Sequence, residues 1–269
     1  MSHPATKRFP SAEFRSSMDW FVLSGVLLVL IIPVLDIKDA LVVHARRGER
    51  QAYRPLETPL SLRPALEDVA EGLRSVYPFT IFYVADLDAI GGQTGDCSAA
   101  LRLTRLTPTP GVWLDAGFSG SESLARTHAL PGVAPVVGSE SLTDAAFLTH
   151  FSAYPGAILS LDFRGEAFCG PEDVLARSDL WPSRVIVMTL ARVGSETGPD
   201  FARLAEIKAR AGARQVVAAG GVRDATDLWK LAEMGISAAL VATSIHNGTL
   251  TREVIAGMME GSDTVAQRR

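Results

Sequence analysis

Three apolar segments in the first half of this 269-residue chain recur in the second half, and this repeat strongly constrains the fold. The copies keep their order: 31–38 recurs at 157–164, 113–124 at 217–228, and 136–139 at 240–243. The last two pairs are equally far apart in sequence, whereas an extra polar stretch after Lys38 separates the first pair further. The repeat predicts a barrel made of two half-barrels, with the functional residues at the strand ends.

Apolar runs of strand length alternate with amphipathic helical stretches, which is typical of parallel strands joined by helices. The expected strands are 31–37, 79–87, 111–116, 133–138, 156–163, 184–190, 214–219 and 237–243. The expected helices are 62–76, 97–106, 121–129, 142–152, 171–178, 199–211, 224–234 and 249–260. Eight of each predict an α/β fold, a single (β/α)8 TIM barrel over residues 30–269 with a two-fold half-barrel repeat. An open doubly wound sheet is the alternative, but the paired repeats favour a closed ring.

Single residues also predict where two of the helices begin and end. Pro199 suits the first turn of the helix expected at 199–211. Asp224 is placed to cap the following helix and Gly235 to end it.

The composition excludes several classes of function. The net charge is −4, so the chain lacks the basic excess that would hold a nucleic acid. Its two cysteines, Cys97 and Cys169, form no CxxC pair, and the five histidines show no metal-ligand spacing. We therefore expect no metal, no cofactor and no nucleic-acid partner, and a reducing cytoplasmic location. The sequence does not predict an oligomeric state.

The N-terminal region imitates a signal peptide, because the apolar run 20–35 follows a basic stretch. The end of that run is needed as the first strand, and the run is shorter than the roughly 20 residues of a membrane span. We therefore interpret residues 1–29 as a disordered leader and expect no membrane attachment.

Two acids end equivalent strands of the two halves, Asp36 in the first and Asp162 in the fifth. In a ring of eight these strands are opposite, so the two carboxyls are expected to face each other across the mouth as an acid–base pair. The alternative is that each acid caps a loop or pairs with Lys38 or Arg164. Thr189 ends the sixth strand, where its hydroxyl is expected to orient a substrate.

A phosphate site is expected at the ends of the last two strands. Gly220 and Gly221 separate an apolar strand from a helix, so backbone N–H groups converge there on an anion. Ala242 and Thr243 end the next strand and are expected to add donors, with charge from Arg223. The alternative is a tight turn without a ligand.

These motifs together resemble the HisA/HisF family of histidine-biosynthesis barrels. The resemblance covers about residues 31–260, and its motifs are IPVLDIK at 32–38, VADLDA at 84–89, GPD at 198–200 and AGGV at 219–222. It implies an aldose–ketose (Amadori) isomerase whose substrate carries two phosphates, bound at strands 3/4 and 7/8. It further implies Asp36 as the general base, with Asp162 and Thr189 as helpers.

The chain departs from this family pattern at three places. After strand 6 the family carries Arg-Asp-Gly, and this chain has Arg192-Val193-Gly194, which lacks the expected acid. At the first phosphate site the chain has Asp115-Ala116-Gly117 and Gly138-Ser139-Glu140, whose carboxylates would repel a phosphate. The arginine-rich loop at 46–54 is more similar to a HisA/HisF-related branch of methanogens and one-carbon-using bacteria.

We therefore expect a small, sugar-like substrate with one phosphate on strands 7 and 8 and hydroxyl or amine donors at its other end. Further substrate-binding residues are expected at the strand ends and in the first loop, namely Asp86, Arg50, Arg54, Asp115, Gly117, Gly138, Ser139 and Glu140. Three functions stay open: a histidine-type isomerase, an enzyme of tetrahydromethanopterin or methanofuran synthesis, and a non-catalytic ligand-binding barrel.

Overall fold

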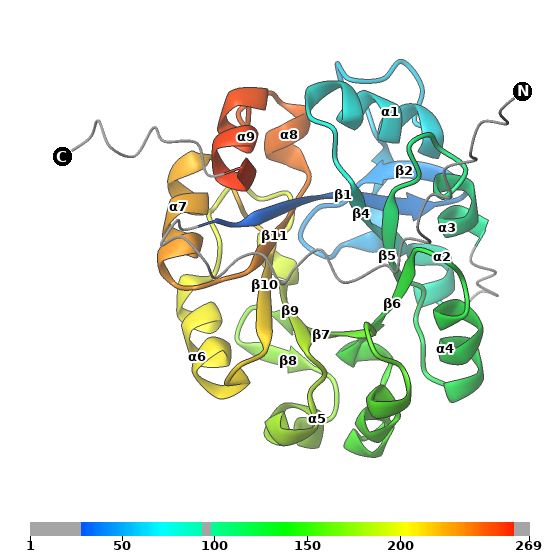
Figure 1. Cartoon of the computed structure of the whole chain (residues 1–269), viewed down its shortest axis with the longest axis vertical. Helices are drawn as coiled ribbons and strands as arrows, with labels where there is room; N and C mark the ends of the chain where they lie inside the picture. The colour runs from blue at the N-terminus through cyan, green and yellow to red at the C-terminus, as the bar shows by residue number, and fades with distance from the viewer. Residues whose placement is uncertain (1–27, 93–97, 261–269) are drawn as a thin grey trace, which may run out of the picture.

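The computed structural model describes residues 28–92 and 98–260, and eight parallel strands within them close into a barrel (Figure 1). In ring order the strands are β1 (Leu30–Lys38), β4 (Ile81–Asp86), β5 (Gly111–Asp115), β6 (Val133–Gly138), β7 (Ile158–Arg164), β9 (Arg184–Thr189), β10 (Gln215–Ala219) and β11 (Ala238–Val241). Pairing of β11 with β1, Leu30 against Ala238 and Pro33 against Val241, closes the ring. The TIM-barrel prediction is confirmed, and the open-sheet alternative is wrong.

Helices cover the outside of the barrel at the positions that the sequence predicts (Figure 1). They are α1 (Leu66–Val76), α3 (Ser98–Leu103), α4 (Ser121–His128), α5 (Glu172–Ala176), α6 (Phe201–Ala211), α7 (Ala225–Glu233) and α9 (Arg252–Glu260). The helix predicted at 142–152 is instead a 3-10 helix, η3 (Ala145–Ala153). The hydroxyls of Thr149 and Ser152 donate to carbonyls three residues earlier, which competes with α-helical hydrogen bonding.

Two of the three predicted helix-end residues take the expected roles. The Asp224 carboxylate accepts from the N–H groups of Thr226 and Asp227, and Gly235 follows α7 with φ of 69°. The prediction for Pro199 is wrong, because α6 begins at Phe201. Asp200 is its N-cap, and the Asp200 carboxylate accepts from the Arg203 N–H.

Several short elements follow the carboxyl ends of the strands and were not predicted. The polar stretch after β1 forms an excursion over residues 39–65, which contains β2 (Leu41–His44), η1 (Arg50–Ala52) and β3 (Arg54–Pro55). It runs back antiparallel to β1, with Ile37 opposite Val42. The other additions are α2 (Leu87–Ile90), η2 (Ser139–Ser141), β8 (Ala167–Cys169), η4 (Ser178–Leu180), η5 (Leu190–Arg192) and α8 (Thr243–His246). All of these additions except η4, which follows α5 and leads into β9, lie beside the mouth at the carboxyl ends of the strands.

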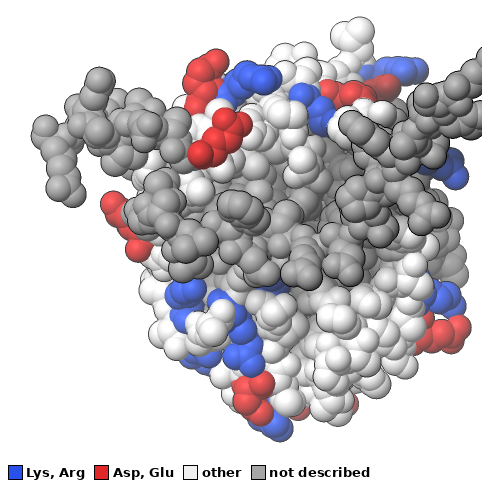
Figure 2. Space-filling model, in the orientation of Figure 1, with Lys and Arg blue, Asp and Glu red and all other residues white. Residues whose placement is uncertain are grey.

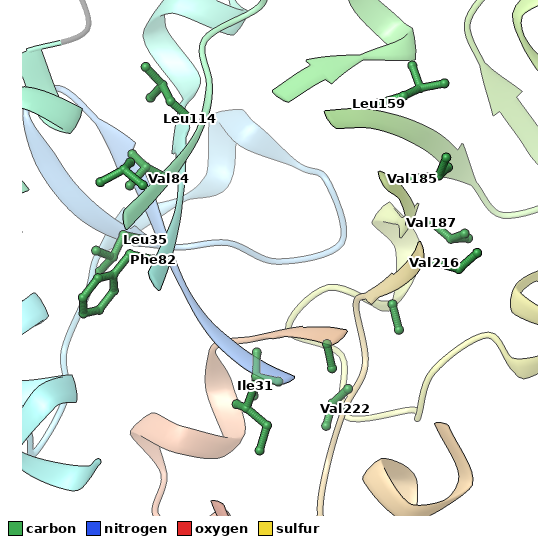
Figure 3. Close-up of a cluster of buried hydrophobic side chains, with 14 of the residues drawn as sticks. Ile31, Leu35, Phe82, Val84, Leu114, Leu159, Val185, Val187, Val216 and Val222 are labelled. Carbon is green, nitrogen blue, oxygen red and sulfur yellow. The ribbon is translucent and has the colours of Figure 1, made fainter. Parts of the chain in front are cut away.

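The strands separate two hydrophobic cores. The outer core, between strands and helices, includes Ile31, Leu35, Phe82, Val84 and Val187, which point away from the barrel centre in Figure 3. The inner core fills the barrel with alternating residues of the same strands, including Ile32, Tyr83, Trp113, Ile158 and Leu240. Because successive side chains alternate between the two faces, this register turns Asp36, Asp115 and Asp162 toward the barrel interior.

The described residues begin within the predicted N-terminal leader. Residues 1–27 lie outside the described residues, so the interpretation of this leader stays a prediction. Val29, which we assigned to it, is buried, and its N–H donates to the Met258 carbonyl.

Within the described ranges, no helix is long and apolar enough to cross a membrane. On the face shown in Figure 2, acidic and basic side chains are interspersed around the periphery.

Candidate active site

A cavity of about 530 Å³ opens at the carboxyl ends of the barrel strands. Its wall includes residues from strand ends and from the loops that follow them, which is where TIM barrels carry their active sites. Acidic groups from one side of the ring and a glycine-rich turn from the other share this wall. The residues that line the cavity include Asp36, Arg50, Tyr83, Asp115, Glu140, Asp162, Gly220, Gly221, Ala242 and Thr243.

Three aspartates, on β1, β5 and β7, carry their carboxyls into this cavity. Asp36 is opposite Ala85 in the sheet register, and Ala85 is opposite Asp115, which places two of the three at the same height. Burial disfavours the charged form and raises the pKa of each carboxyl to about 7. Groups with such values can both accept and donate protons near neutral pH.

Asp162 is held by hydrogen bonds to both of its oxygens. The Ser160 hydroxyl donates to one oxygen at 2.7 Å, and the Glu140 N–H donates to the other at 3.3 Å. The Ser139 hydroxyl lies 3.2 Å from that second oxygen, and it donates to the Cys169 carbonyl at 2.7 Å. The same hydroxyl accepts from the Asp162 N–H, so Ser139 supports Asp162 and is itself fully buried.

Asp115 lies on the neighbouring side of Gly138. Its carboxyl accepts from the Tyr83 hydroxyl at 3.3 Å and from the Gly117 N–H at 3.2 Å. A Cβ on Gly138 would lie 3.2 Å from an oxygen of Asp162 and 3.5 Å from one of Asp115. An oxygen of each carboxyl therefore borders the space that a side chain at Gly138 would fill.

Asp36 differs from the other two aspartates, because no hydrogen bond reaches its carboxyl from any residue that the structure describes. Arg50 lowers its pKa and Asp115 raises it, and both effects are smaller than that of burial. Asp36 does not pair with Lys38, because the Lys38 ammonium donates to the Arg50 carbonyl at 3.1 Å. The alternative pairing of Asp162 with Arg164 does not occur among the described residues either. A carboxyl without fixed donors keeps its lone pairs available to a substrate.

Arg50 brings a positive charge to the acidic side from the excursion at 39–65. Its guanidinium forms an ion pair with Glu140, which follows β6 across the mouth. The two side chains are 32% and 25% exposed, so the pair lies at the edge of the cavity and not in its depth. Because Glu140 takes this cation, the three aspartates have no ion-pair partner of their own in the described ranges.

The opposite wall is a glycine turn between β10 and α7. Gly220 and Gly221 have φ of 101° and 88°, and a Cβ would lie 2.8 Å from the Thr189 carbonyl oxygen or 2.4 Å from that of Gly198. Only glycine fits both positions. Ala242 and Thr243, at the start of α8, line the cavity beside this turn.

Six predicted site residues do not line the cavity, and two of them, Gly138 and Ser139, lie beside Asp115 and Asp162 as described above. Thr189 is opposite Phe163, whose side chain packs in the outer core, and the preceding Met188 faces the cavity instead. The Asp86 carboxylate caps α2 by accepting from the Ala89 N–H. Arg54 is exposed on β3. Gly117, with φ of 66°, packs its backbone against Ile90 and supports Asp115 through its N–H.

Arg223 also departs from its expected role, because its guanidinium forms two hydrogen bonds of 2.8 Å with the Asp227 carboxylate. The positive charge of Arg223, which we expected to face a phosphate, is therefore largely neutralised by Asp227 in α7.

Sequence reasoning missed several residues of the cavity wall. Tyr83 is one that alternation along β4 predicts, because it lies two residues before Ala85 on the inward face. His246 is another: burial lowers its pKa to about 4, and its Nδ1 lies 3.1 Å from the Thr58 hydroxyl. That contact joins residues far apart in sequence, so no local pattern predicts it. In the described part of the chain, no three His, Cys, Asp or Glu residues gather as a metal site requires.

Comparison with known proteins shows which family the chain resembles. Residues 30–251 match the family model described as histidine biosynthesis protein. The chain is 27% identical to an uncharacterized protein of Methanocaldococcus jannaschii, over 84% of this chain and 96% of that protein. It is 28% identical to a Moorella thermoacetica protein over 84% of this chain and 96% of the relative, and 24% identical to a Pyrococcus furiosus protein over 83% and 91%.

Both of the latter are named 1-(5-phosphoribosyl)-5-((5-phosphoribosylamino)methylideneamino)imidazole-4-carboxamide isomerase. Their names place two phosphoribosyl groups on the substrate of those proteins. None of these names mentions a one-carbon carrier, so the predicted link to that chemistry stays a prediction.

Proposed function

Because the chain belongs to the family of histidine biosynthesis proteins, we propose that it is a phosphosugar isomerase of the aldose–ketose (Amadori) type. The observation that carries the proposal is the division of one cavity between buried carboxyls and a glycine turn. The carboxyls supply acid–base chemistry, and the turn supplies backbone donors for an anion. Two relatives named as isomerases support the reaction class.

The reaction requires one base and one acid. In an N-ribosylamine, the acid protonates the ring oxygen as the bond between C1 and that oxygen breaks, and the base removes the proton on C2. The base then returns a proton to C1 while the C2 hydroxyl gives up its proton to form the ketone, so no atoms or electrons are gained or lost. Asp36 is the proposed base, because its carboxyl has free lone pairs and a pKa of about 7.

Asp162 is proposed to hold and orient the substrate opposite Asp36. The donors from Ser160 and Glu140 fix the position of the carboxylate. A carboxylate held in this way is a precise acceptor for a substrate hydroxyl or amine.

The substrate is proposed to carry one phosphate. Gly220, Gly221, Ala242 and Thr243 form the side that suits an anion. The side between β5 and β6 instead presents the carboxyl groups of Asp115 and Glu140, where a phosphate would need hydrogen-bond donors. The substrate end that reaches this side is expected to carry hydroxyl or amine groups.

Isomerase assays on purified protein test the proposal. The probes are the bis-phosphoribosyl carboxamide named for the relatives and an N-(5-phosphoribosyl) arylamine, which has one phosphate. We expect turnover of the singly phosphorylated probe, and a loss of about 100-fold or more in kcat for Asp36→Asn. Asp88→Asn is the control, because Asp88 accepts from the Asp39 N–H outside the cavity. No turnover of either probe, in wild type as in Asp36→Asn, contradicts the proposal and favours the non-catalytic barrel.

A further inference from the structure

The proposed reaction needs a proton donor, and the loop after β9 does not provide a buried one. Val193 and Gly194 line the cavity there and carry no acid. The preceding Arg192 is engaged with the carbonyls of Thr197 and Gly198. The next acid along this loop, Glu196, lines the rim but is exposed and has φ of 54°. The donor must therefore be sought among the other carboxyls of the cavity.

Most of those carboxyls are engaged by other groups or exposed. Asp224 accepts two backbone N–H groups as the cap of α7, and Glu140 forms the ion pair with Arg50. Glu57 is exposed at the rim. With Asp36 assigned as the base, Asp115 and Asp162 remain, and both are more than nine-tenths buried.

Hydrogen bonding distinguishes these two. Donors reach both oxygens of each carboxyl, but the closest donor to Asp162, the Ser160 hydroxyl, lies at 2.7 Å. The donors to Asp115 lie at 3.2 and 3.3 Å, near the outer limit of a hydrogen bond. Close donors stabilise the ionised form, so Asp162 releases a shared proton more readily than Asp115 does.

We propose that Asp115 is the proton donor of the site, and that it holds a proton shared with Asp162 across Gly138. This inference rests on the proposed isomerase function and assigns the acid that the loop after β9 lacks. In the reaction, the Asp115 carboxyl protonates the ring oxygen and becomes a carboxylate. It regains its proton from the C2 hydroxyl when the ketone forms, so the site returns to its starting state.

The surroundings of Asp115 agree with this role. The pKa of Asp115 is raised to about 7, and burial is the largest cause. The Glu140 carboxylate also acts to raise this pKa, whereas Arg50 and the hydrogen bonds act to lower it. Asp115 in turn raises the pKa of both Asp36 and Asp162. Two carboxyls that interact in this way lose their protons in separate steps. The charged and titratable groups that face Asp115 are Asp36, Arg50, Tyr83, Glu140 and Asp162.

A titration of the aspartate carboxyls by carbon-13 NMR, between about pH 4 and pH 9, tests the shared proton without a substrate. Asp115→Asn and Asp162→Asn assign the signals. We expect Asp115 to stay protonated to near neutral pH, and each substitution to lower the pKa of the remaining partner. Asp115 ionised by pH 5, or unaffected by Asp162→Asn, overturns the proposal.

Tyr83→Phe is a second variant that keeps all the carboxyls. It removes a hydroxyl that stabilises the ionised form, so we expect the pKa of Asp115 to rise. An unchanged or lower pKa of Asp115 in this variant contradicts the assigned hydrogen bond and, with it, the proposed environment of the donor.

Kinetics with the singly phosphorylated probe test the donor role itself. Asp115→Asn is expected to lower kcat about 100-fold or more, with little change in KM, and to remove the alkaline limb of the pH profile. Glu196→Gln is expected to retain the alkaline limb. If Glu196→Gln loses this limb while Asp115→Asn keeps it, the proposal is overturned. If wild type turns over neither probe, the isomerase function fails, whereas the titration still decides whether Asp115 holds the proton.

Discussion

The cavity carboxyls show at the scale of single residues how burial sets chemistry. Asp36, Asp115 and Asp162 have pKa values raised to about 7, because the cavity removes water from each carboxyl without supplying an ion-pair partner. The folded state therefore binds protons that the unfolded chain, with ordinary aspartate pKa values, releases. Stability from these groups is fully present below about pH 4 and is lost as the pH rises through about 7.

Asp115→Asn tests this linkage through stability. The amide resembles the protonated acid, so the variant should match wild type near pH 4 and exceed it near pH 8, by up to about 4 kcal/mol in free energy of unfolding. Urea denaturation at the two pH values measures the difference. A variant that is equally destabilised at both pH values would show that the Asp115 carboxylate is stabilised in the fold.

Arg50→Ala tests the cation that lowers the pKa of Asp36. Arg50 lowers the pKa of Asp36, so its removal should move that pKa above 7 and shift the acid limb of activity to higher pH. Arg54→Ala is the matched control, because Arg54 is exposed on β3 and does not line the cavity. Equal shifts in the two variants would assign the effect to general surface charge.

At the scale of elements, short apolar runs predicted the strands, but the orientation of a strand's last residue depends on where its register ends. Asp36 and Asp162 face inward as expected, whereas Thr189 lies one position past the inward-facing Met188. Side chains in the loops proved harder to predict. The Asp86 carboxylate caps α2, which begins where β4 ends. No hydrophobic pattern in the sequence predicts such a cap.

Gly138→Ala tests the contact of three strands. Its backbone, with φ of −75°, suits any residue, so we expect the variant to fold. The new Cβ would lie 3.2 Å from Asp162 and 3.5 Å from Asp115, which should displace the carboxyls, lower kcat about tenfold or more and weaken their coupled titration. Gly111→Ala is the control, because its Cβ meets nothing closer than 3.5 Å at the start of β5. A fully active Gly138→Ala would contradict the assigned geometry.

At the scale of the whole molecule, the internal repeat predicted the barrel but not the difference between its halves. Gly117 and Gly221 are equivalent by repeat, yet Gly221 lines the cavity, whereas Gly117 packs against Ile90 and supports Asp115. The excursion at 39–65 adds a second asymmetry, because it brings Arg50 to Glu140 and Thr58 to His246. Such contacts join distant parts of the chain, so the sequence alone could not reveal them.

The central claim is that one half of the barrel binds an anion while the other supplies carboxyls. Crystals soaked in inorganic phosphate test this claim most directly. The account predicts phosphate density beside Gly221 and Thr243, and none beside Gly117 and Gly138. Density of equal strength on both sides would contradict the claim and indicate a substrate with two phosphates.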